Sequence, residues 1–162
     1  MFMQSTPPLD VELNAAILTI AARLFPCGYL ISEDAPDTYD KLVVHLDCGK
    51  PLVVFAGGSE QTIYGDREVN YAFRAWHDWC HWRGGHPFNR EGEQAVYAMQ
   101  CQHLVQLYDY SLRTRRWFDI LYAEIIGQQL YFEQHRQFPA DQRAFVERFL
   151  AGLAREQIIA AE

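Results

Sequence analysis

The spacing of hydrophobic and polar positions changes near Asp66. From there almost to the end, apolar residues recur every three to four positions, which is the period of amphipathic helices. The Gly84-Gly85-His86-Pro87 run and the Phe138-Pro139 pair interrupt the pattern. Asn89 is a suitable N-cap for the second helix and Thr114 for the third. The breaks predict four helices, over 66–83, 90–112, 115–137 and 140–158.

The first 65 residues show a different pattern. An amphipathic helix is predicted over 10–25, and a loop over 27–40. Two β-branched runs, 42–46 and 52–55, flank a turn that contains Gly49 and Pro51, and such runs are typical of an antiparallel hairpin. The sequence therefore predicts a mainly α, overall α+β fold. Its parts are the helix 10–25, an N-terminal antiparallel β-hairpin within 41–64, and a bundle of four to five helices within 66–158.

The length and the charge of the chain limit the domain organisation and the partners that can be expected. A chain of 162 residues is expected to form a single domain, 1–162, with a self-sufficient core. Its 14 basic and 21 acidic residues give a net charge of −7, which disfavours binding to duplex nucleic acid. No apolar run approaches a membrane span, and the four cysteines form no CxxC pair. A cytoplasmic protein with free thiols is the expectation, and a homo-oligomer is compatible with the Trp-rich helix.

Residues 76–82 carry the strongest chemical signal, in the sequence Trp-His-Asp-Trp-Cys-His-Trp. On a helix, His77 and His81 lie one turn apart on the same side, which is the spacing that two-histidine metal sites use. Helical placement puts Asp78 away from the core, where Arg74 is its expected partner on the surface. The sequence thus separates a candidate metal pair from a more peripheral acid.

Polar residues also interrupt the apolar faces of the next two helices. The second helix carries Glu93, Gln100 and His103 among apolar positions, and the third carries Glu124, Gln128 and His135. Buried polar groups are costly without partners. The simplest explanation is that these groups meet one another, or a metal ion, inside the bundle.

The preferred metal ligands are His77 and His81, completed by Glu124 and either Glu93 or His103. Gly127, one turn beyond Glu124, would allow the third helix to approach a neighbour closely. Nitrogen and oxygen ligands without a thiolate suit a divalent ion such as zinc, manganese or iron. The rival interpretation is a buried polar network that holds no metal.

The spacing His77-Asp78-x-x-His81 resembles the HExxH helix of zincin metallopeptidases, in which the glutamate is the general base. Asp78 is one methylene shorter, so a peptidase mechanism is not expected. The pair His77-Asp78 also resembles the dyad of HD-domain phosphohydrolases, which are all-helical and use divalent metals to hydrolyse phosphate esters. That resemblance covers these two residues. In overall texture, with Arg-Ala-Trp-His-Asp-Trp-Cys-His-Trp and Tyr-Phe-Glu-Gln-His, the chain is similar to small uncharacterised bacteriophage and prophage proteins.

Two functional hypotheses follow. The first is a metal-dependent hydrolase of a small phosphate ester or nucleotide, in which a metal-bound water attacks the substrate. Glu93, Glu124 or Asp78 would accept a proton, and Arg74 or an arginine of the cluster 113–116 would stabilise developing negative charge. The second is a non-catalytic interaction or inhibitor protein that binds a host protein, with the histidines in a structural role.

Overall fold

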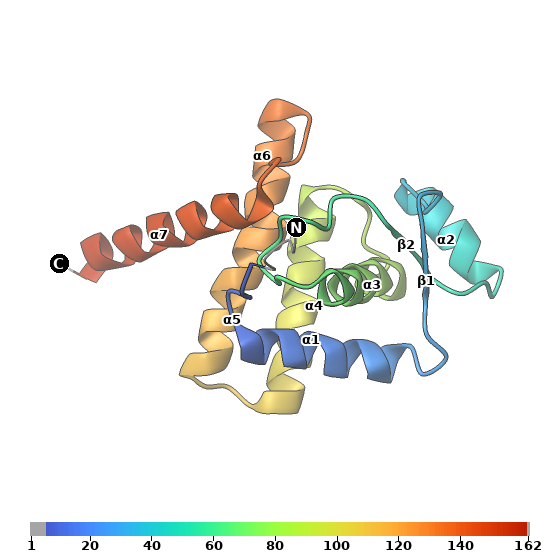
Figure 1. Ribbon diagram of the computed structural model, residues 1–162, viewed down its shortest axis with the longest axis horizontal. Helices are drawn as coiled ribbons and strands as arrows, with labels where there is room; N and C mark the ends of the chain where they lie inside the picture. The colour runs from blue at the N-terminus through green and yellow to red at the C-terminus, as the bar shows by residue number, and fades with distance from the viewer. Residues whose placement is uncertain (1–5, 162) are drawn as a thin grey trace, which may run out of the picture.

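The protein is mainly helical and carries a small two-stranded parallel sheet (Figure 1). The computed structural model describes the backbone of residues 6–161 and the side chains of residues 6–156; residues 1–5 and 162 of the predicted domain lie outside this range. The elements, in chain order, are α1 (Val11–Leu24), β1 (Leu30–Ser32), α2 (Tyr39–Asp47), β2 (Val53–Phe55), α3 (Arg67–Gly84), α4 (Arg90–Tyr108), α5 (Leu112–Tyr122), the π-helix η1 (Ala123–Gly127), α6 (Gln128–His135) and α7 (Gln142–Ala161).

The predicted antiparallel hairpin is wrong. Residues 42–46, predicted as its first strand, belong to α2, which begins after Thr38; the Thr38 side chain accepts a hydrogen bond from the backbone N–H of Lys41. The strand that pairs with β2 is β1, inside the predicted loop 27–40. The pairing is parallel, with Leu30 opposite Val53 and Ser32 opposite Phe55. Parallel strands need a crossover between them, and α2 provides it.

The helical half follows the predicted pattern with shifted ends. Asn89 caps α4 as predicted, because its side chain accepts from the backbone N–H of Gly92. The helix ends earlier than expected, at Tyr108, where Asp109 takes a left-handed φ of 59°. The cap of α5 is Ser111 and not Thr114. Thr114 instead closes the capping box of that helix from its third position.

Helix α3 lies at the centre of the molecule, with α1 crossing it and α4 beside it (Figure 1). The main core contains the fully buried Trp76 and Trp117, and a smaller cluster around Val54 and Tyr71 joins the sheet to α3. α5, η1 and α6 follow one another as a single long rod, from which α7 extends to one side (Figure 1). Within residues 6–161, no helix combines the length and the apolar character that crossing a bilayer requires. All four cysteines are free thiols.

Candidate metal centre

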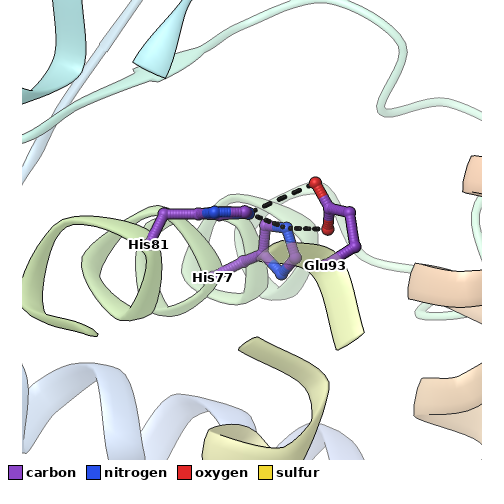
Figure 2. Close-up of side chains that lie close together, drawn as sticks. All are labelled: His77, His81 and Glu93. Carbon is purple, nitrogen blue, oxygen red and sulfur yellow. Dashed lines mark hydrogen bonds and ion pairs between the residues drawn. The ribbon is translucent and has the colours of Figure 1, made fainter. Parts of the chain in front are cut away.

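The last two turns of α3 and the first turns of α4 face each other across a tight return. Gly85 ends α3 in a left-handed conformation, with φ of 68°, and its N–H bonds back to the carbonyls of His81 and Trp82. Only glycine adopts this conformation without strain, so the chain can turn sharply here. Asn89 then starts α4 and places Glu93 beside the histidines of α3 (Figure 2).

His77, His81 and Glu93 converge on one point (Figure 2). The Nε2 atoms of the two histidines lie 3.1 Å apart. Glu93 Oε2 lies 3.1 Å from Nε2 of His77, and Oε1 lies 3.3 Å from Nε2 of His81. Two ligand atoms held ~2.0–2.1 Å from a tetrahedral ion lie roughly 3.3 Å apart. The three side chains therefore have the spacing of ligands around one metal ion.

The other ring nitrogen of each histidine has a fixed acceptor. Nδ1 of His81 lies 2.7 Å from the backbone oxygen of His86, and Nδ1 of His77 lies 3.1 Å from Oε1 of Gln100. A carbonyl oxygen only accepts, so each Nδ1 carries the hydrogen and each neutral ring presents a lone pair at Nε2. This is the arrangement that positions metal-binding histidines in general.

The convergent atoms require a cation among them. Two Nε2 lone pairs and a carboxylate repel one another at these distances, unless a proton or a metal ion lies between them. The cluster is also largely buried, since the His81 side chain is 1% exposed and that of Glu93 is 13% exposed. Around the rings, Phe73 stacks on His77 and Phe88 packs edge-on against His81. The geometry can hold one divalent ion, with an imidazole and carboxylate ligand set.

The protonation states of His77 and Glu93 follow from their burial and from the charge that each carries. Burial alone would lower the pKa of His77, but the charge and hydrogen bond of Glu93 outweigh it and raise this pKa to about 9. Burial would raise the pKa of Glu93, but the charge and hydrogen bond of His77 lower it to about 2. In the metal-free protein the pair is therefore an imidazolium and a carboxylate at neutral pH.

Two predicted ligands are not part of this cluster. His103 lies about ten residues beyond Glu93 on α4, where its Nδ1 accepts a hydrogen bond of 2.9 Å from the indole of Trp76. The residue that lies beside the two histidines is Glu93. The sequence predicted Glu93 as the alternative to His103 as a ligand, and also as a candidate proton acceptor. Glu124 lies on η1, in the wall of a neighbouring cavity. The structure thus brings three of the predicted polar residues together and leaves His103 and Glu124 outside this group.

The cavity has a volume of about 480 Å³ and reaches the candidate metal centre at His77. Asp78 lines it and is partly buried, so the predicted position facing away from the core is wrong. Arg74 also lines it, but it does not form the predicted pair with Asp78 among the described residues. Its guanidinium donates instead to the carbonyls of Phe55, Gly57 and Gly58, because the chain after β2 folds over α3.

The arginine cluster 113–116 lies elsewhere. Arg113 forms an ion pair with Glu12, and Arg116 with Asp10, both near the start of α1. None of these arginines lines the cavity, so Arg74 is the arginine in its wall. The sequence did not indicate the backbone oxygen of His86 as a partner, since a carbonyl leaves no residue-type signal.

Comparisons of the chain with protein-family models, with curated proteins and with solved structures found no match.

Proposed function

We propose that the protein is a metal-dependent hydrolase of a small phosphate ester or nucleotide, with His77, His81 and Glu93 as ligands of one divalent ion. The observation that carries the proposal is the convergence of two Nε2 atoms and a carboxylate, with both Nδ1 atoms bound to carbonyl oxygens. Two histidines and a glutamate form the ligand set of catalytic zinc sites that keep a fourth position for water. Manganese and iron accept the same ligands.

A bound divalent ion would supply hydroxide near neutral pH, by lowering the pKa of a coordinated water to roughly 7. Asp78 is the candidate proton acceptor, because it follows His77 directly and lines the same cavity. Burial raises its pKa, against the opposing charges of His77 and His81, so the group is a stronger base than an exposed aspartate.

Arg74 is the candidate group for binding the phosphate. Three of its N–H groups donate to the carbonyls of the last residue of β2 and of the segment after it, which fixes the guanidinium in the cavity wall. A guanidinium has five N–H groups, so two are left for a ligand. Because the cavity wall is mostly apolar, one fixed cation has a strong effect on where a phosphate binds there.

The test is metal analysis of the protein purified without a histidine tag, followed by assays with p-nitrophenyl phosphate and nucleoside monophosphates. We expect one equivalent of zinc, manganese or iron in the wild type and less than a tenth of that in His77→Ala and His81→Ala. Hydrolysis should fall at least a hundredfold in both. His135→Ala changes an exposed histidine outside the cluster and should keep both the metal and the activity.

Two results would contradict the proposal. If the wild type is fully stable and takes up no divalent ion, then His77 and Glu93 form a buried ion pair and the cluster has a non-catalytic role. A protein that binds the metal at His77 and His81 but hydrolyses none of the phosphate esters would remove the enzymatic part.

A further inference from the structure

The cavity beside the metal centre is lined by exposed phenyl rings at its mouth. Phe55, Phe88 and Phe138 are 49%, 38% and 54% exposed, and all three line this cavity. They come from β2, from the return between α3 and α4, and from the segment between α6 and α7. They are also the phenylalanines that are well exposed within the described residues. Three such rings from separate segments make the opening aromatic and apolar, which suits a ligand that carries an aromatic ring.

The inner wall of the cavity carries an unsatisfied acid. Glu124 is 9% exposed, and its Oε1 has no hydrogen-bond partner among the described residues. Such a group is costly, and a native structure retains it where something else satisfies it. The side chain of Glu124 also lines the cavity, so its carboxylate can reach a ligand there. The acid lies on a π-helical turn, a rare element that is frequent at functional sites.

A second buried polar side chain that lines the cavity is an amide, and it adds a further acceptor. Asn70 is 3% exposed and lines the cavity, and its Nδ2 donates to Oγ of Ser59 at 2.9 Å. One of its N–H groups is therefore used, and the carboxamide oxygen is left to accept. With Glu124, this wall is suited to a ligand that donates hydrogen bonds. Burial raises the pKa of Glu124 to about 8, and a donated N–H would favour the ionised form.

We propose that this cavity binds the base of a nucleotide substrate and that Glu124 accepts a hydrogen bond from the exocyclic amino group of that base. The inference deepens the proposed function and rests on it for the phosphate end of the ligand. A cavity of about 480 Å³ lies in the usual range for small-molecule sites. Cytosine, adenine and guanine carry such an amino group, whereas uracil carries a carbonyl there.

The experiment measures nucleoside binding by calorimetry, in the metal-free and the zinc-loaded protein. Cytidine and uridine form a matched pair, because they differ at the amino or carbonyl group and at the ring nitrogen beside it, which accepts in cytidine and donates in uridine. We expect cytidine to bind at least tenfold more tightly than uridine. Glu124→Leu should remove that preference, and Glu124→Gln, which keeps a carbonyl acceptor and the side-chain shape, should retain part of it.

The contribution of the exposed phenyl rings at the opening of the cavity is tested with separate variants. Phe138→Ala should weaken the binding of both nucleosides by a similar factor. Tyr110→Ala removes an aromatic ring that is 65% exposed outside the cavity, and it should change neither. Equal affinity for cytidine and uridine, no binding of either, or an unchanged preference in Glu124→Leu would overturn the inference. Nucleosides contain no phosphate and the metal-free protein is included, so these results are independent of the metal and hydrolysis assays.

Discussion

The side chains of His77 and Glu93 keep each other charged, and this sets how the centre would bind a metal. At neutral pH the imidazolium carries a proton on the nitrogen that a metal would use, because its pKa is raised to about 9. A metal ion must displace that proton. The apparent affinity should therefore rise with pH and level off near pH 9.

The corresponding prediction is that zinc binding at pH 7 releases about one proton from His77, and that affinity increases roughly tenfold per pH unit below 9. Calorimetric titrations in two buffers of different ionisation enthalpy measure the released proton directly. Glu93→Gln removes the charge that raises the His77 pKa, so the variant should release less than the wild type. Identical heats in the two buffers would contradict the prediction.

Glu124 is the second residue whose charge depends on burial. Its pKa is about 8 in the folded protein against an ordinary 4.5, so between these values the folded state holds a proton that the unfolded chain has lost. The stabilising effect of that proton is complete below pH 4.5 and is lost as pH rises to about 8. Across this interval the group lowers the free energy of unfolding by up to ~1.4 kcal/mol per pH unit.

Glu124→Gln should therefore gain stability relative to the wild type as pH rises from 5 to 8. Urea unfolding at pH 5, 6.5 and 8 measures the difference. Glu91→Gln, which removes the same charge at an exposed position of α4, is the control. A difference between Glu124→Gln and the wild type that stays constant with pH would show that Glu124 is not buried as an acid.

The sequence predicted part of the proposed centre because one helix carries two of its candidate ligands. His77 and His81 lie four residues apart, and that spacing fixes their relation wherever α3 packs. The identity of the third candidate ligand depends on the level at which α3 and α4 cross. Glu93 and His103 are ten residues, or about 15 Å, apart along α4, so one histidine pair cannot reach both. Helical periodicity gives the face of a residue but not the level at which two helices meet.

At the scale of elements, the N-terminal half shows why short apolar runs mislead. Leu42-Val43-Val44 is apolar and contains two β-branched valines, but a run of this length also fits a helix, and Thr38 supplies a cap that favours one. The strand β1 has three residues, which is too few for a visible alternation. The amphipathic helix 10–25 was predicted to within one residue, because its period extends over several turns.

The contact of α7 with the long rod depends on a glycine, as the sequence suggested. A Cβ placed on Gly127 would lie 3.0 to 3.3 Å from ring atoms of Phe149. Gly127→Ala should therefore displace that ring and lower the free energy of unfolding by about 1–3 kcal/mol. Thermal unfolding measures the loss.

Gly152→Ala, on α7, is the matched control. A Cβ there meets nothing within 4 Å, so alanine should stabilise the helix by up to ~1 kcal/mol. Loss of stability in both variants would mean that the effect of Gly127→Ala does not depend on its contact with Phe149, and stabilisation in both would mean that α7 does not pack tightly on η1.

At the scale of the whole molecule, the proposed metal centre joins two helices that come from different parts of the core. α3 carries the side chains that pack against α1 and the sheet, and α4 packs against α3 and the π-helical turn. The net charge of −7 favours the approach of cations over that of nucleic acid. The single domain remains a prediction, and it implies that a ligand bound between α3 and α4 stabilises the entire fold.

Zinc should accordingly raise the melting temperature in a concentration-dependent way. Free zinc at a hundred times its Kd adds about 2.7 kcal/mol, which for a chain of this size corresponds to a shift of roughly 5–10 °C. The shift should disappear in His77→Ala and His81→Ala and persist in His135→Ala, because His135 is exposed outside the cluster. An equal shift in His77→Ala would assign the stabilisation to zinc bound elsewhere. Two separate unfolding transitions, with zinc acting on one of them, would show that α3 and α4 do not couple the molecule into one cooperative unit.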